Sequence, residues 1–460
     1  MPDFFSAPVL GIDLGASFTK VSYRPGWTKG KRYDQPCRLV MIENRPLVPS
    51  LVIHKKGARK SWLCGQAAAG YRPLDGDQVF TNWKADLFSN ELTLRVSGSL
   101  KAAGEFFRWL HEKVSGAGIN VAECRVKVCL PAFPDIDRPA SILGQEMELA
   151  GWHNATVSRV SEPRANTVGV FGEGRNTLYR SDWRSDVNPV YMEMYPHGSP
   201  LLNHLRQFGL AGGPRHATIV IADIGSFTTD LSIVDFDAGA DGDCIANTQQ
   251  TSYKVGIIAG FEEPLLNHLS GRHGFAVEGL TFEEREAIKQ AFALGKSFVL
   301  TLPGSQNIKL GDAADQKVAR QIAAELASRV WDSYREKTAN KQVKYLILTG
   351  GGSVAPLVRD AIHTRFSSAK VNWADVDGME TENGEVGDLR RWPDTSETLA
   401  RLATAVGAAS VILDLPAGPP PKEEISIGPV ESPWISCGCQ GGNKECMRCD
   451  GRGMYLRQAR

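Results

Sequence analysis

Apolar positions along the chain form short runs and helical stripes that alternate over two long segments. The first segment extends from Val9 to about Gly172, and the second extends from Thr218 to about Leu415. Short apolar runs predict strands at the opening residues and at "SLVIH", "RVKVCL", "ATVSRVSE", "TIVIAD", "LSIVDF" and "KYLILTGGG". Helical periodicity predicts helices near 100–116, over "ASILGQEMELAG", near 262–270, 281–296 and 313–338, and after Pro356 and Ser396. This alternation is typical of α/β layers around a mixed sheet.

Polar and proline-rich stretches divide these segments. Residues 173–215 are rich in Gly, Asn, Arg and Pro, which predicts an inserted loop, and a second polar insertion covers about 374–396. A proline-rich linker is expected over 416–434. At 460 residues the chain is too long for one core, and ~150 residues per domain suggests about three units. We therefore expect units at 1–215 and 216–415, then the linker and a cysteine-rich end at 435–460.

The same acidic turn occurs twice. Aligned on their aspartates, the turns read Asp13-Leu-Gly15-Ala-Ser17 and Asp223-Ile-Gly225-Ser226-Phe227-Thr228, and each lies between two apolar runs. Glycine at such a bend permits positive φ and close approach of a ligand, and successive amides there can hold phosphate oxygens. An aspartate at the strand end offers hard oxygen ligands for Mg²⁺, usually through water. The alternative is two ordinary hairpins with capping aspartates.

Charge and hydropathy narrow the choice of partners. The 52 basic and 52 acidic residues cancel, so no net charge steers the chain to nucleic acid or an acidic membrane. The longest apolar-rich run, from Leu402 to Leu413, is shorter than the about 20 residues that span a bilayer. The N-terminal residues lack the pattern of a secretory signal. We expect a cytoplasmic protein without membrane or nucleic-acid partners.

A third element follows the two acidic turns. "YLILTGGGSVAPLVRDAI" predicts a strand that ends in Gly350, Gly351 and Gly352 and leads into a helix, an arrangement that suits a nucleotide phosphate or sugar. Two acidic turns and a glycine turn in this order resemble the actin-like ATPase superfamily. The resemblance implies a two-lobed, ribonuclease-H-like α/β fold with a nucleotide bound between the lobes, so that residues 1–215 and 216–415 are the two lobes.

Further stretches resemble one branch of that superfamily, the nucleotide-binding domain of the 70-kDa heat-shock chaperones (DnaK-like). The stretches are "VPSLVIHKKGARKSWLCGQAAA", "VFTNWKADLF", "VCLPAFPDIDRPASILGQEMELAGW", "RVSEPRANTVGVFGEG" and "EAIKQAFALGKSFVLTLP". The resemblance covers roughly residues 8–415. It implies that Lys84 is the catalytic lysine, that Glu162 lies near the metal, and that Pro131 and Arg138 relay the nucleotide state between the lobes.

The resemblance also implies a division of labour at the site. Asp13, Glu162 and Asp223 would hold hydrated Mg²⁺. Lys84 would orient water, Thr228 would bond the γ-phosphate and Asp230 would be an accessory carboxylate, because phosphoryl transfer needs charge neutralisation and positioning. The remaining expected nucleotide contacts are Gly15, Ala16, Ser17, Phe18, Gly225, Ser226, Phe227, Gly260, Glu286, Lys289, Gly350, Gly351 and Gly352.

Several positions depart from the family. Ser226 and Phe227 replace glycines, Ala16 replaces a threonine near the γ-phosphate, and Gln290 and Val354 replace basic residues beside the adenine. The changes imply slow hydrolysis of MgATP, or a nucleotide sensor with little hydrolysis. No peptide-binding sandwich follows residue 415, so we expect an ATP-controlled switch that signals to a protein client or co-chaperone. A filament-forming actin-like ATPase and a small-molecule kinase are the alternatives.

The cysteines form two groups. Cys37, Cys64, Cys124, Cys129 and Cys244 are scattered, as expected of reduced, buried side chains. Cys437, Cys439, Cys446 and Cys449 lie within thirteen residues, a spacing that favours a tetrahedral Zn²⁺ site over a disulfide pair or a redox Cys-x-x-Cys. "CMRCDGRG" also resembles one repeat of the zinc domain of DnaJ-type co-chaperones. Such a zinc site would recruit a client or partner, or cap the chain end.

Overall fold

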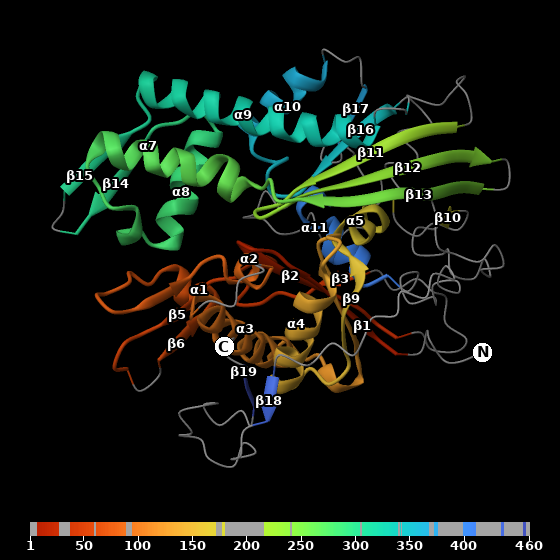
Figure 1. Ribbon diagram of the computed structural model, residues 1–460, viewed down its shortest axis with the longest axis horizontal. Helices are drawn as coiled ribbons and strands as arrows, with labels where there is room; N and C mark the ends of the chain where they lie inside the picture. The colour runs from red at the N-terminus through yellow and green to blue at the C-terminus, as the bar shows by residue number, and fades with distance from the viewer. Residues whose placement is uncertain are drawn as a thin grey trace.

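The computed structural model has a mixed α/β fold (Figure 1). It describes residues 7–26, 37–58, 61–88, 94–171, 177–179, 216–239, 242–303, 306–338, 341, 343–367, 372–375, 399–410, 434–436 and 454–456. Most of the predicted 173–215 and 374–396 insertions, the linker over 416–434 and all four clustered cysteines lie outside these residues. In the described part, no helix is both long and apolar enough to cross a membrane.

The first large sheet contains the first acidic turn. Its strand order is β3-β2-β1-β8-β9, with β4 also paired to β2. Strands β1 and β2 are antiparallel, whereas β1, β8 and β9 run parallel. The bounds are β1 Val9–Leu14, β2 Phe18–Arg24, β3 Arg38–Leu39, β4 Val48–Pro49, β8 Arg125–Leu130 and β9 Ala155–Ser161. Every residue of β1 is buried, because the strand is central in its sheet.

The second large sheet contains the second acidic turn. Its order is β10-β13-β12-β11-β16-β17. Strands β11, β12 and β13 are antiparallel neighbours, and β11, β16 and β17 run parallel. The bounds are β10 Thr177–Tyr179, β11 His216–Ile224, β12 Thr229–Gly239, β13 Gly242–Tyr253, β16 Val343–Thr349 and β17 Asn372–Asp375.

The two sheets repeat one arrangement. In each, a central strand is followed by an antiparallel hairpin partner on one side and by two parallel strands on the other. The central strands are β1 and β11, and their ends carry Asp13 and Asp223. The predicted acidic hairpins are therefore confirmed as hairpins, and they occupy the same place in two similar sheets.

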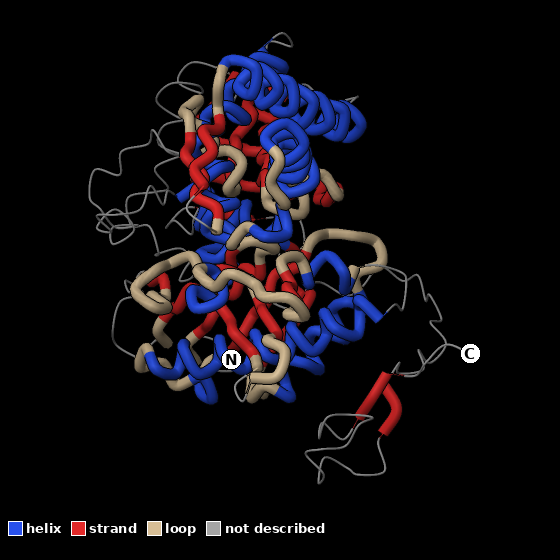
Figure 2. The backbone as a smooth tube through the Cα atoms, turned by 90° about the vertical axis from the view of Figure 1, so that its left-hand side faces the viewer, coloured by secondary structure: helices blue, strands red, loops and turns tan. Residues whose placement is uncertain are grey.

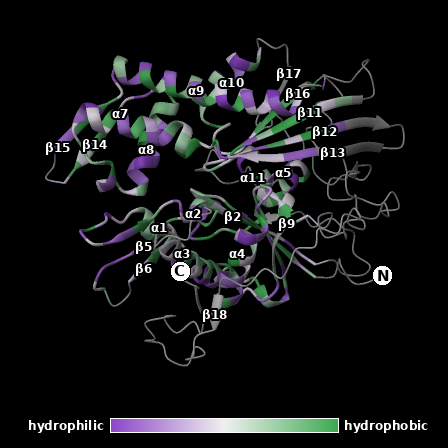
Figure 3. Cartoon of the chain, in the orientation of Figure 1, coloured by the Kyte–Doolittle hydropathy of each residue, from purple (hydrophilic) through white to green (hydrophobic). Residues whose placement is uncertain are grey.

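Helices pack beside each sheet, as the perpendicular view shows (Figure 2). Around the first sheet are α1 Gly65–Ala69, α2 Trp83–Leu87, α3 Leu94–Gly116 and α4 Asp137–Leu149; around the second are the π-helical turn η4 Ile258–Glu262, α7 Glu263–His273, α8 Phe282–Ala293, α9 Ala313–Thr338 and α10 Pro356–Ser367. Each group has its own apolar core. Along α9 the buried residues recur at helical spacing, for example Ala319, Ala323, Leu326 and Val330. The helices accordingly carry both hydrophobic and hydrophilic residues (Figure 3).

Short elements complete the described chain. They are the three-stranded sheet of β5 Val52–His54, β6 Trp62–Cys64 and β7 Gln78–Phe80, the β14–β15 hairpin of Phe298–Leu302 and Gln306–Leu310, and the 3-10 turns η1 Val121–Glu123 and η5 Val277–Gly279. Near the C-terminus, β18 Trp434–Ser436 pairs antiparallel with β19 Met454–Leu456. This pairing brings together the two ends of the segment that contains the clustered cysteines.

Two helices, α5 Glu162–Phe171 and α11 Leu399–Ala408, cross between the sheets at unusually short distance. A Cβ added at Gly407 would lie 1.7 Å from the carbonyl oxygen of Ala165, and one added at Gly169 would lie 1.8 Å from that of Ala403. Helix α11 also contacts β1, since a Cβ at Gly11 would meet the backbone of Ala409. The boundary predicted at residues 215–216 stays a prediction; β10 and α11 both make contacts across it.

Replacing Gly407 with alanine is expected to separate α5 from α11. The added methyl group has no space, and overpacking of this kind costs about 3 kcal/mol of unfolding free energy. Thermal unfolding should show the loss. Gly271→Ala in α7 is the matched control, because its Cβ would meet nothing within 4 Å and alanine favours a helix. Equal melting temperatures for Gly407→Ala and wild type would contradict this packing.

Several expectations from the sequence need correction or extension. Strand β13 and the β14–β15 hairpin are additional to the predicted elements, and α3 begins at Leu94 rather than near residue 100. The 173–215 insertion contains strand β10, which pairs with β13. Cys64, Cys124 and Cys129 are buried thiols as expected, whereas Cys37 is partly exposed; the side chain of Cys244 lies outside the described residues.

Candidate functional site

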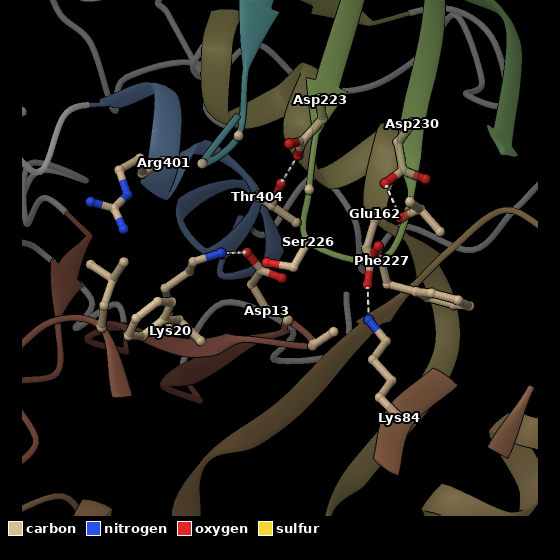
Figure 4. Close-up of a pocket in the computed structure, with 18 residues that line it drawn as sticks. Asp13, Lys20, Lys84, Glu162, Asp223, Ser226, Phe227, Asp230, Arg401 and Thr404 are labelled. Carbon is tan, nitrogen blue, oxygen red and sulfur yellow. Dashed lines mark hydrogen bonds and ion pairs between the residues drawn. The ribbon is translucent and has the colours of Figure 1, made fainter. Parts of the chain in front are cut away.

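A cavity with four carboxylates lies where the two acidic turns meet; we call it the acidic cavity (Figure 4). Both large sheets and the helices α2, α5 and α11 contribute to it. Its lining residues are Asp13, Gly15, Ala16, Phe18, Lys20, Leu47, Lys84, Glu162, Asp223, Gly225, Ser226, Phe227, Thr228, Asp230, Gly350, Gly351, Arg401 and Thr404. The chain thus brings together Asp13, Lys84, Glu162, Asp223 and Thr228, which are far apart in sequence.

A second, larger cavity of about 220 Å³ adjoins the first; we call it the apolar cavity. It contains seven of the predicted nucleotide contacts, namely Ser17, Phe18, Ser226, Glu286, Lys289, Gly351 and Gly352. Its other lining residues are mainly apolar, and Gln290 and Val354 are among them.

Gly260 lines neither cavity. It lies in the π-helical turn, where a Cβ would meet the side chain of Leu326 at 2.6 Å, so its role is packing against α9.

Lys84 and Glu162 form a buried ion pair on one wall of the acidic cavity. The Lys84 Nζ lies 2.5 Å from Glu162 Oε1 and also donates to the carbonyl oxygen of Leu14. Lys84 lies on the short helix α2. The preceding residue of this helix, Trp83, is buried and donates to the Ser50 carbonyl. Burial raises the pKa of Glu162 to about 7, although Lys84 acts against this shift. The pair therefore lies where β1 and α5 meet, and Lys84 bonds both elements.

Asp223 is positioned by the crossing helices. Its Oδ2 accepts hydrogen bonds from Asn166 Nδ2 of α5 at 2.8 Å and from Thr404 Oγ1 of α11 at 2.9 Å. Burial raises its pKa to about 6, and the charge of Asp13 adds to this increase. Gly350, with φ of 85°, passes so close to Asp223 Oδ1 that a Cβ would lie 2.2 Å away. Only glycine fits here, which explains the first residue of the glycine turn.

Asp13 is paired with Lys20, a residue that the sequence analysis missed. The two residues oppose each other in the β1–β2 register, and Lys20 Nζ lies 2.7 Å from Asp13 Oδ2. Burial lowers the pKa of Lys20, but Asp13 overcomes this effect and leaves the pKa raised. A detectable signal existed, because a tight hairpin with Asp13 in its first strand places a residue of the second strand directly opposite.

The glycines of the two acidic turns are needed for space rather than for positive φ. Neither Gly15 nor Gly225 adopts positive φ. A Cβ on Gly15 would lie 2.2 Å from the carbonyl oxygen of Phe18, and one on Gly225 would lie 3.1 Å from that of Thr228. The expected positive φ is therefore wrong, and the close contact seen at these glycines is with the hairpin's own backbone; close approach of a ligand stays a prediction.

Phe227 of the second acidic turn packs against two aromatic rings. Its ring lies 5.9 Å from that of Phe88 and 6.2 Å from that of Phe133, both in the part of the chain built on the first sheet. Phe227 therefore joins the second turn to the apolar core of the first sheet. Phe227 also lines the acidic cavity.

A chain of hydrogen bonds connects the acidic cavity to the loop after β8. Thr228 Oγ1 donates to Asp230 Oδ2 at 2.9 Å, and Ser252 Oγ donates to Asp230 Oδ1. The same Ser252 oxygen accepts from the backbone N–H of Ala132 at 2.7 Å, directly after Pro131. Pro131 is buried, whereas Arg138 is exposed at the start of α4. Burial raises the pKa of Asp230 well above its ordinary value.

Polar contacts connect α1 and its following loop to α8 and the turn before it. Arg72 pairs with Glu284 and donates to the Gly279 carbonyl at 2.7 Å.

Glu286 and Lys289 pair on one face of α8, as their spacing predicts. Lys289 also lies 2.9 Å from Glu262; burial lowers its pKa, but the two glutamates overcome this effect and leave it raised.

The carboxylates of the acidic cavity are suitable for Mg²⁺. Asp13, Glu162 and Asp223 face one space from three elements, and hard carboxylate oxygens bind this ion, often through retained waters. Among the described residues, no three His, Cys, Asp or Glu side chains form a set that could ligate a metal directly. The four clustered cysteines were predicted to bind zinc and lie outside this description.

Comparison with models of known protein families and with curated proteins gives no match for this chain. The function must therefore be inferred from the residues of the two cavities.

Proposed function

We propose that this chain is a DnaK-like ATPase of the actin-like type, which binds MgATP between two lobes, hydrolyses it slowly and signals its nucleotide state to a protein partner. The observation that carries this proposal is the duplicated sheet. In each of the two large sheets, a central strand with an antiparallel partner on one side and two parallel strands on the other ends near an aspartate, and both aspartates line one cavity. The glycine turn at Gly350 and Gly351 reaches the same cavity.

The two cavities divide the nucleotide between them. The acidic cavity, with its carboxylates and cations, suits the polyphosphate, and the apolar cavity suits the base and sugar. Glu286 and Lys289 line the apolar cavity and would bind sugar hydroxyl groups. Because Gln290 and Val354 are not cationic, the base would be held mainly by apolar contact.

The residues of the acidic cavity account for slow hydrolysis. Asp13, Glu162 and Asp223 would hold hydrated Mg²⁺, which supplies charge neutralisation at the phosphate oxygens when bound. Lys84 would orient the attacking water and offset developing charge, while Thr228 would bond the terminal phosphate. Ala16 contributes no hydroxyl group to the first turn, and Lys20 already neutralises Asp13. Both features favour binding over fast turnover.

The hydrogen-bond chain from Thr228 provides a route for the signal. A phosphate bound at Thr228 would alter its bond to Asp230, and Asp230 is tied through Ser252 to Ala132 beside Pro131. Loss of the terminal phosphate would thus change the contact between the second sheet and the loop after β8. A protein that contacts this loop or α4 could detect the change.

Phosphate release from ATP tests the proposal. Purified protein should release phosphate slowly and only when Mg²⁺ is present, without transferring it to sugars. The nucleotide state should not change sedimentation. Phosphate transfer to a sugar would identify a kinase, and ATP-dependent sedimentation would identify a filament-forming ATPase. Absence of both nucleotide binding and hydrolysis would overturn the proposal.

The cysteine-rich end is proposed to hold one zinc ion through Cys437, Cys439, Cys446 and Cys449, and to contact a client or co-chaperone. The pairing of β18 with β19 places Ser436 opposite Met454, on either side of the cysteines in the sequence. Elemental analysis should find one zinc per chain, lost in Cys446→Ser but retained in the control Cys37→Ser. Thiols that bind no zinc, or a disulfide among these four cysteines, would contradict the metal site.

A further inference from the structure

Arg401 lies at the junction of the acidic and apolar cavities. Four residues line both cavities, namely Phe18, Ser226, Gly351 and Arg401, and Arg401 is the charged one among them. A ligand that extends from one cavity into the other must pass this junction. Arg401 therefore lies beside the middle of such a ligand rather than beside either end.

Helix α11 fixes the position of Arg401. Three residues after Arg401, Thr404 bonds Asp223, and Ala405 and Ala409 further along accept hydrogen bonds from Ser22 and Arg24 of β2. Figure 4 shows Arg401 on the same side of the acidic cavity as Lys20 and opposite Lys84. The cation is thus carried on a well-anchored helix, across the acidic cavity from Lys84.

The charge of Arg401 acts on both cavities. Burial lowers the pKa of Lys20 and the Asp13 charge raises it. Arg401 also lowers this pKa. Burial raises the pKa of Glu286 in the apolar cavity, whereas Lys289 and Arg401 lower it. The guanidinium is consequently within electrostatic reach of both the polyphosphate end and the sugar end. An arginine can grip a phosphate with two parallel N–H donors and stays charged at every working pH.

We propose that Arg401 binds the phosphate next to the sugar and so makes the site select nucleotides over nucleosides. This inference rests on the proposed nucleotide function. Arg401 adds positive charge at the junction, where the phosphate that remains after hydrolysis would lie. It therefore retains the diphosphate product and slows its release.

Equilibrium titration with ATP, ADP, AMP and adenosine tests the assignment, with competition against a fluorescent nucleotide for the weaker ligands. Arg401→Ala should weaken AMP and ADP about tenfold and leave adenosine unchanged, because the lost contact involves only a phosphate. Arg401→Lys should recover part of the loss. Arg320→Ala, an exposed arginine on α9, is the matched control and should change nothing.

The outcomes separate this inference from the function on which it rests. If wild-type protein binds none of the four ligands, the proposed function fails. If wild type binds AMP more tightly than adenosine and Arg401→Ala keeps that difference, the inference alone fails. An equal loss for AMP and adenosine would also overturn it, since Arg401 would then act on the sugar, the base or the fold. Arg401→Gln, which preserves side-chain length, repeats the comparison should the alanine variant unfold.

Discussion

Lys84→Met is expected to lower phosphate release by about 100-fold or more while nucleotide binding remains within a few-fold of wild type. Lys84 is buried, with its Nζ 2.5 Å from Glu162 on the wall of the acidic cavity. Methionine retains the apolar length of the side chain but removes the ammonium group. Water would lose its orienting donor, and the charge that develops on the phosphate would lose its nearest cation.

The same substitution should leave the fold intact. Loss of Lys84 removes an influence that lowers the pKa of Glu162, so this carboxyl group would stay protonated near neutral pH instead of remaining as a buried, unpaired charge. Lys309→Met, on the exposed side of β15, is the control for loss of one lysine. Phosphate release and nucleotide affinity measured on the same samples distinguish the two effects. Unchanged steady-state hydrolysis in Lys84→Met would contradict the role assigned to Lys84.

Asp223→Asn should have opposite effects on stability and on ligand binding. Asparagine retains an oxygen for the hydrogen bonds from Asn166 and Thr404 but cannot become a carboxylate. In wild type, burial raises the pKa of Asp223 from 3.8 to about 6. The stabilisation that comes from this raised pKa is therefore complete below pH 3.8 and is lost as the pH rises through about 6. Above that value the ionised group costs at most about 3 kcal/mol of unfolding free energy.

The nucleotide-free Asp223→Asn protein should accordingly melt at a higher temperature than wild type at pH 8, and the difference should shrink toward pH 5. Binding of MgATP should fall at least about tenfold, because the variant lacks a charged oxygen for the hydrated metal. Melting curves in EDTA and titrations in Mg²⁺ give the two readouts. Asp332→Asn, exposed on α9, serves as the control. A variant that binds MgATP as wild type does would remove Asp223 from the site.

Local patterns predicted the parts of the fold that depend on neighbouring residues. The two acidic hairpins, the glycine turn at Gly350 and the pairing of Glu286 with Lys289 all follow from short-range spacing. Strand β13 was missed because "GDCIANTQQTSY" contains few consecutive apolar residues, and its pairing with β12 provides what its sequence does not indicate.

Long-range contacts account for what the sequence could not predict. Asn166 and Thr404 meet at Asp223 only because α5 and α11 cross at Gly169 and Gly407. The sequence indicates only that Phe227 replaces a glycine. In the structure its ring lies near those of Phe88 and Phe133. Arg401 offers no local signal, since it is one arginine on an apolar helix. Lys20 was within reach of prediction, because its position opposite Asp13 follows from the hairpin register.

Calorimetric titration of ATP into the full chain tests the central claim most directly. With Mg²⁺ present, we predict one ATP bound per chain. With EDTA in place of Mg²⁺, or with Asp223→Asn in place of wild type, the affinity should fall at least about tenfold. Absence of binding to wild type, or binding of equal strength with and without Mg²⁺ and Asp223, would contradict a nucleotide site built from the two acidic turns.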